Sequence, residues 1–317
     1  MFATPTSRYV FGTLPWYSVL IVSGICLALF LALREEKRLG LPKDTVIDLA
    51  LWLIPSGIVG ARLYYVLFTW DMFRSDPLRI FRIWEGGLAI YGAVLGGLAA
   101  AMLFSRKRKL SLPVLTDMIV PGLAIAQAIG RWGNYFNMEA YGAAVTNPRW
   151  QFFPAAVLIP GLSGGVWHQA TFFYESMWDL LVFAMLMVTR RHMRRSGDTT
   201  LWYLALYGAG RFVIEGLRTD SLMLGHLRVS QGLSGLMALS VLIVFLRRGW
   251  TAGRRLPALL LAAMVVAAPL LLMLPLPPTV SHMLLMLLAL VISAIAYIRT
   301  KPAELEDQPC PPHPSKI

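Results

Sequence analysis

Nine runs of mainly apolar residues, most of them close to 20 residues long, dominate this 317-residue chain. A helix needs about 20 apolar residues to cross the roughly 30 Å hydrocarbon layer of a bilayer. Helices are favoured there because they satisfy their own backbone hydrogen bonds. Charged residues make up only 15% of the chain, as expected of an all-α polytopic membrane protein. The runs lie near 15–34, 44–68, 86–104, 113–131, 170–189, 201–217, 229–247, 257–275 and 279–298.

The distribution of positive charge predicts how the chain crosses the membrane. Most of the 29 basic residues, including every lysine, fall in alternate connecting segments and in the C-terminal tail. Segments rich in lysine and arginine stay on the cytoplasmic side. We therefore expect the N-terminus outside, the C-terminus in the cytoplasm and residues 132–168 as a small extracytoplasmic cap. The net charge of +12 then reflects topology and anionic lipid, and it does not indicate nucleic-acid binding.

Every basic residue outside those segments is an arginine. A guanidinium group offers a planar fork of donors that matches phosphate, and it does not lose its charge by deprotonation. Arginine alone on the outer side therefore suggests an anionic ligand, although a general preference for arginine over lysine would give the same pattern. The two cysteines, Cys26 and Cys310, cannot form a disulfide framework. No metal-ligand motif is present, so we expect neither a metal nor a cofactor.

Three polar or glycine-rich clusters interrupt the apolar runs. Ionisable side chains at membrane depth are costly and usually mark function. Glycines allow a second helix or a ligand to approach the backbone closely, and plain helix packing is the simpler explanation for them. The clusters are GRWGNYFNMEAYG (130–142), YGAGRFVIEGLRTD (207–220) and WEGGLAIYGAVLGG (84–97).

Two arginines from separate clusters could form one phosphate-binding pocket. Arg131 has Glu139 nearby in the sequence, and Arg211 has Glu215 one helical turn away. The carboxylates would hold the guanidinium groups in place when the pocket is empty. Simpler alternatives are that Arg131 extends from a helix end towards the membrane surface, and that Arg211 and Glu215 only fasten one helix. On a helix, Tyr207, Arg211, Glu215 and Arg218 share one stripe.

These motifs resemble the prolipoprotein diacylglyceryl transferase family. The family pattern G-R-x-G-N-[FY]-x-N-x-E-x-x-G is matched throughout residues 130–142, including Asn134 and Gly142. The block Y-G-x-x-R-[FY]-x-x-E-x-x-R is matched from Tyr207 to Arg218. The stretches PWYSVL (15–20) and TFFYESMWD (171–179) also resemble the family, and the resemblance covers roughly residues 10–250.

The resemblance implies a reaction and a role for each matched residue. Members of the family transfer diacylglyceryl from phosphatidylglycerol to the lipobox cysteine of a prolipoprotein in the bacterial cytoplasmic (inner) membrane. Arg131 and Arg211 would grip the phosphate, and Tyr91 occupies the place where many relatives have a histidine base. The expected substrate-binding residues are Tyr17, Arg131, Asn134, Glu139, Gly142, Tyr207, Arg211, Glu215 and Arg218.

The resemblance also predicts how the chain is divided. Residues 1–250 would form a seven-span transferase core, residues 251–299 an additional two-span hairpin, and residues 300–317 a disordered cytoplasmic tail. Two other functions remain open from the residues alone. A lipid transporter could use the same arginines to bind an anionic head group, although no internal repeat is visible, and another head-group transferase could also consume phosphatidylglycerol.

Overall fold

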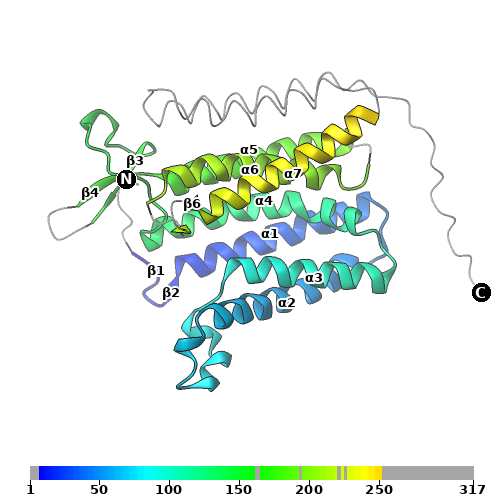
Figure 1. Ribbon diagram of the computed structural model, residues 1–317, viewed down its shortest axis with the longest axis horizontal. Coiled ribbons are helices and arrows are strands. Elements are labelled where there is room, and N and C mark those ends of the chain that lie inside the picture. Colours follow the sequence, from blue (N-terminus) through cyan, green and yellow to red (C-terminus); the bar gives the residue numbers. More distant parts are fainter. Residues whose placement is uncertain (1–6, 161–164, 193–194, 220–222, 225–226, 252–317) are drawn as a thin grey trace, which may run out of the picture. The chain divides into compact units, whose positions relative to one another are not determined.

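A computed structural model describes residues 7–160, 165–192, 195–219, 223–224 and 227–251 (Figure 1). A long helix occupies each of the first seven predicted runs. Four of them, α1, α2, α4 and α5, are long and apolar enough to cross a membrane. The helices are α1 (Trp16–Arg38), α2 (Thr45–Phe68), α3 (Ile90–Arg108), α4 (Leu112–Asn137), α5 (Thr171–Thr189), α6 (Asp198–Leu217) and α7 (Val229–Thr251).

The chain forms two compact units, Met1–Met237 and Ala238–Ile317, and the boundary between them lies within α7. The functional residues predicted from the sequence all belong to the first unit. The predicted hairpin at 251–299, apart from Thr251, and the predicted tail at 300–317 lie outside the described residues, so both stay predictions.

Within the first unit, α4 is the central helix. It packs against α1 on one side and against α5 and α6 on the other, whereas α2 and α3 pair mainly with each other (Figure 1). Small residues bring α2 and α3 together. A Cβ atom added at Gly60 would overlap the carbonyl oxygen of Gly92, and one added at Gly96 would overlap that of Ser56. Gly92 and Gly96 of the glycine-rich cluster at 84–97 therefore serve helix packing.

One end of the bundle carries a small cap between α4 and α5. Strands β3 (Ala156–Ile159) and β4 (Val166–Gln169) form an antiparallel hairpin. A further segment runs along β4, since the amide of Gly142 donates to the carbonyl of Gln169 at 2.9 Å. A buried apolar cluster packs this cap against α4, and its members are Tyr135, Val157, Ala170 and Phe172. We call this end, where α4 stops and α5 starts, the capped end.

Two shorter hairpins and several 3₁₀ turns complete the described structure. The hairpins are β1 (Tyr9–Val10) with β2 (Leu14–Pro15), and β5 (Met223–Leu224) with β6 (Leu227–Arg228). The 3₁₀ turns are η1 (Trp70–Met72), η2 (Pro77–Phe81), η3 (Ile83–Glu85), η4 (Pro148–Trp150) and η5 (Arg190–His192).

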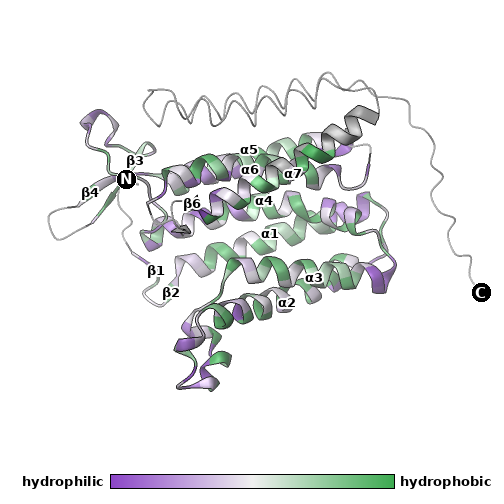
Figure 2. Cartoon of the chain, in the orientation of Figure 1, coloured by the Kyte–Doolittle hydropathy of each residue, from purple (hydrophilic) through white to green (hydrophobic). Residues whose placement is uncertain are grey.

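The opposite end of the bundle carries the basic connections. Successive helices alternate in direction, so the segments between α1 and α2, α3 and α4, and α5 and α6 meet there, and they are hydrophilic in Figure 2. Two carboxylates, from Glu35 and Asp117, organise this end. Glu35 pairs with Arg190 at 2.6 Å, and Asp117 accepts hydrogen bonds from the amides of Gly197 and Thr200 at 2.6 and 2.8 Å. Asp117 thereby satisfies free amides at the start of α6.

Candidate active site

Arg131 and Arg211, predicted from separate motifs, lie together in the bundle because both contact Glu175. The Nη2 atom of Arg131 is 2.6 Å from Oε1 of Glu175. Nη1 of Arg211 donates to both oxygens of the same carboxylate, at 2.9 and 3.0 Å. Three helices therefore meet at one carboxylate, with α4 and α6 each contributing one guanidinium group and α5 contributing Glu175.

Glu215 adds a second carboxylate to this cluster. Its Oε2 atom is 2.6 Å from Nη2 of Arg211, one helical turn away on α6, as the sequence spacing predicted. The carboxylates are almost fully buried, with side chains 2% exposed, whereas the arginine side chains remain 21% (Arg131) and 14% (Arg211) exposed. The two glutamates are thus enclosed by protein, whereas part of each arginine side chain remains exposed.

Glu175 was not among the residues predicted to form the site. It lies in the stretch TFFYESMWD, where Glu175 and Asp179 are the two acidic residues in a mainly apolar run. Both of its partners come from other helices, so no local spacing reveals them. The available signal was the cost of an unpaired carboxylate at that depth, which calls for positively charged partners.

Glu139 was predicted to brace Arg131, and its observed contacts are different. Its Oε1 atom accepts a hydrogen bond from Asn137 at 3.1 Å, and the side chain of Asn137 also accepts one from Arg8 at 3.1 Å. The helix α4 ends at Asn137, and Met138 turns into the left-handed region at φ 56°. Glu139 thereby leaves the helical face that carries Arg131, and we reassign the brace to Glu175.

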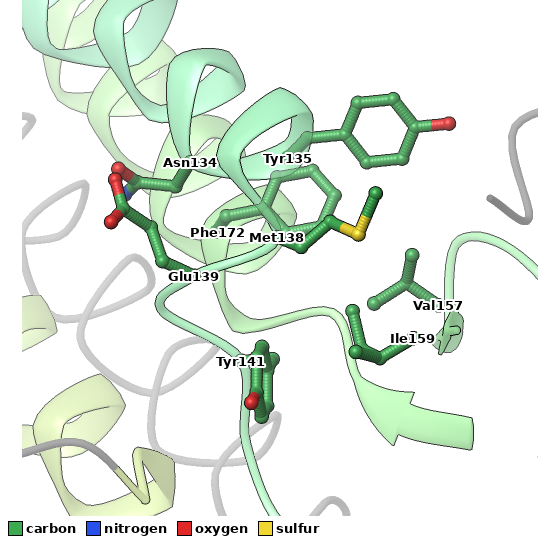
Figure 3. Close-up of a pocket in the computed structure, with 8 residues that line it drawn as sticks. All are labelled: Asn134, Tyr135, Met138, Glu139, Tyr141, Val157, Ile159 and Phe172. Carbon is green, nitrogen blue, oxygen red and sulfur yellow. The ribbon is translucent and has the colours of Figure 1, made fainter. Parts of the chain in front are cut away.

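Asn134 and Glu139 instead lie beside a shallow hollow at the capped end. Figure 3 shows their polar groups side by side, with apolar side chains from α4, β3 and α5 around the rest of the hollow. Its empty volume is about 160 Å³. The lining residues are Asn134, Tyr135, Met138, Glu139, Tyr141, Val157, Ile159 and Phe172.

Close contacts explain why glycine occupies two positions of the motif at 130–142, Gly133 and Gly142. The ring of Tyr17, at the start of α1, lies so close to Gly133 that a Cβ atom there would overlap it. Gly142 forms a bridge with Arg218, which follows the end of α6, and a Cβ atom at Gly142 would lie 2.7 Å from Oε1 of Gln169. Gly133 thus lets α1 approach α4, and Gly142 lets the cap approach the end of α6.

Tyr207 and Tyr91 lie in different surroundings. Tyr207 lies one turn before Arg211 on α6 and stacks on Tyr203, with ring centroids 5.6 Å apart. The hydroxyl of Tyr91 lies 3.1 Å from Oγ of Ser230, and this contact joins α3 to the first turn of α7. Tyr207 thus belongs to the arginine cluster, whereas the observed polar contact of Tyr91 is with α7.

Arg62 on α2 and the three arginines between α2 and α3 make their contacts within the protein. Arg62 is buried and donates to the backbone carbonyls of residues 79, 80, 86 and 87 at 2.6–3.0 Å. It therefore organises the connection from Thr69 to Ala89. The other arginines of this connection form ion pairs: Arg74 with Asp71 at 3.3 Å, Arg79 with Glu85 at 2.9 Å and Arg82 with Asp76 at 3.1 Å.

The arrangement defines a class of protein. Two guanidinium groups inside the helical bundle, held by buried carboxylates, can bind an anionic group through their remaining N–H donors. Among the described residues, no group of three or more His, Cys, Asp or Glu side chains is placed to hold a metal ion. The fold thus defines an α-helical membrane protein that holds a pair of arginine side chains inside its bundle.

Comparison with known proteins identifies the family. The profile of the family described as prolipoprotein diacylglyceryl transferase matches residues 9–247. Three proteins named phosphatidylglycerol–prolipoprotein diacylglyceryl transferase are similar to 74% of the chain: from Limosilactobacillus reuteri (47% identical, 87% of that protein covered), Listeria welshimeri (45%, 85% covered) and Streptococcus mutans (44%, 90% covered). The chain belongs to the prolipoprotein diacylglyceryl transferase family.

Proposed function

We propose that this protein transfers the diacylglyceryl group of phosphatidylglycerol to the thiol of the lipobox cysteine in prolipoproteins, the first step of bacterial lipoprotein maturation. The observation that carries the proposal is the joint contact of Arg131 and Arg211 with Glu175, at 2.6–3.0 Å, inside the region that matches the family. Two guanidinium groups held this close together suit a single phosphodiester.

In the proposed reaction, the cysteine sulfur attacks the glyceryl carbon that bears the phosphate. A carbon–sulfur bond forms, the carbon–oxygen bond to phosphate breaks, and the bonding electrons leave with glycerol phosphate. The thiol gives up its proton, since the thiolate is the reactive nucleophile. Negative charge on the departing phosphate grows along this path, so N–H donors fixed in advance by Glu175 and Glu215 stabilise the transition state more than the ground state.

The location of the site fits a lipid substrate. The arginine cluster lies towards the capped end of the bundle, while the basic connections lie at the opposite end. With those connections in the cytoplasm, the capped end faces outward and the cluster lies at the depth of the outer-leaflet head groups. The acyl chains can then remain in hydrocarbon. This orientation places the N-terminus outside and the C-terminus inside, with a seven-span core and a further hairpin.

A direct assay tests the proposed function. The purified full-length protein is incubated with phosphatidylglycerol and a synthetic peptide that contains a lipobox cysteine, and mass spectrometry then detects the product. We expect a peptide whose mass has increased by one diacylglyceryl group, together with released glycerol phosphate. Movement of phosphatidylglycerol between leaflets without any peptide product would favour the transporter, and consumption of phosphatidylglycerol without lipidation of the peptide would favour another head-group transferase.

A further inference from the structure

A second group of polar side chains lies one helical turn below the arginine cluster, on the side away from the capped end. Helices α4, α5 and α6 each contribute one residue to this group. Each of these residues is four positions from a residue of the arginine cluster, or from Tyr207 on the stripe that carries Arg211. They are Gln127 below Arg131 on α4, Asp179 below Glu175 on α5, and Tyr203 below Tyr207 on α6. Residues four apart share a helical face. We call Gln127, Asp179 and Tyr203 the second polar layer.

Hydrogen bonding and stacking hold part of this layer in place. The hydroxyl of Tyr203 donates to Oε1 of Gln127 at 2.8 Å, which joins α6 to α4. The ring of Tyr203 stacks on that of Tyr207, so the layer is in contact with the stripe that carries Arg211.

Asp179 is the unusual member of the layer. It is only 1% exposed, and its Oδ2 atom has no hydrogen-bond partner among the described residues. A buried polar atom without a partner destabilises the folded protein, so packing alone would favour an apolar residue at this position. Asp179 lies one helical turn from Glu175 on the same face of α5, and the Glu175 carboxylate contacts both Arg131 and Arg211.

We propose that Asp179 is a positioning residue for the two arginines, acting on them from the side opposite to the phosphate. This inference rests on the proposed function, in which Arg131 and Arg211 bind the phosphate of the lipid. Asp179 lies roughly 6 Å farther along α5 than Glu175. It can therefore attract the guanidinium groups without touching the substrate. An orientation fixed in this way keeps the remaining N–H donors aimed at the lipid.

The main test compares two aspartates of the same bundle. Asp179→Asn replaces an ionisable carboxyl group with a neutral amide of nearly the same shape. We expect kcat/KM for phosphatidylglycerol to fall at least tenfold, with KM for the peptide within twofold of wild type and the thermal midpoint unchanged or raised. Asp117→Asn is the matched control, because Asp117 caps α6 at the far end of the bundle. It should lower the thermal midpoint and leave the kinetics of the folded enzyme unchanged.

A second pair of variants separates charge from size. Asp179→Glu and Asp179→Gln add the same methylene group and differ only in charge, so the glutamate variant should be at least fivefold more active. Wild-type kinetics in Asp179→Asn, or equal activity in the glutamate and glutamine variants, would overturn the proposal. If the wild-type protein forms no thioether product, the proposed function itself fails. If it does form the product and Asp179→Asn matches it, only the role of Asp179 is refuted.

Discussion

Glu175 on α5 lies 2.6 Å from the guanidinium group of Arg131 on α4, and no local sequence pattern connects the two. The same carboxylate accepts two hydrogen bonds from Arg211 on α6. One buried side chain therefore sets the separation of both arginines, and the expected phosphate site depends on a residue that we do not expect to touch the phosphate.

We first predict that Glu175→Gln lowers kcat/KM for phosphatidylglycerol about 10- to 100-fold, the usual loss when a residue that orients a functional group is replaced. The glutamine can still accept a hydrogen bond, but it cannot neutralise two guanidinium groups. Glu139→Gln is the matched control, because Glu139 contacts Asn137. Its loss should stay within about threefold. Steady-state lipidation of a lipobox peptide measures both variants, and the reverse ranking would restore Glu139 as the brace.

The second prediction concerns the shape of the guanidinium group. Arg131→Lys keeps the positive charge but loses the planar fork of donors, so it should not recover the activity that Arg131→Ala removes. A lost charge-assisted hydrogen bond costs about 1.5–3 kcal/mol, which corresponds to tenfold or more in turnover. The two variants are compared in the same assay after equal membrane insertion is verified. Near wild-type turnover in the lysine variant would show that charge alone is sufficient.

Tyr91 is tested by removing its hydrogen bond from either side. Tyr91→Phe and Ser230→Ala each delete the contact between α3 and α7. If that contact is all that Tyr91 provides, both variants should lose similar stability, about 0.5–1.5 kcal/mol, and retain most of their turnover. Thermal unfolding and lipidation kinetics are measured on each. Complete loss of turnover in Tyr91→Phe beside an active Ser230→Ala would assign the thiol-activating role to Tyr91.

Glycine packing between α2 and α3 gives a stability prediction with an internal control. A Cβ atom at Gly92 would overlap the backbone of Gly60, whereas one at Gly97 meets no atom within 4 Å. Gly92→Ala should therefore destabilise the protein by about 1–3 kcal/mol, as overpacking usually does. Gly97→Ala should be neutral or stabilising by about 0.5–1 kcal/mol, because alanine favours the helix. Equal thermal midpoints for the two variants would contradict the packing argument.

The features that were predicted correctly depend on residues that are close together in the sequence. Apolar runs of sufficient length gave the first seven helices, and helical spacing gave the pair formed by Arg211 and Glu215. The sequence also singled out Arg131, because an arginine and its polar neighbours at the end of an apolar run are costly.

The remaining features depend on how separate segments meet. Glu175 was missed because its partners lie on two other helices. Glu139 was misplaced as the brace because the left-handed turn at Met138 redirects the chain after α4. Arg62 is one of the arginines outside the basic segments, and its partners are backbone carbonyls between α2 and α3, which no sequence pattern brings close to it.

The central claim is that Arg131 and Arg211 form one phosphate site, and the turnover of Arg211→Ala tests it most directly. The measurement is the rate at which the purified variant converts a lipobox peptide to its thioether product with phosphatidylglycerol, relative to wild type. By analogy with lost oxyanion donors, we expect turnover to fall about 10²- to 10³-fold, or roughly 3–4 kcal/mol of transition-state stabilisation. Turnover within a few-fold of wild type, in a variant that inserts and folds normally, would contradict it.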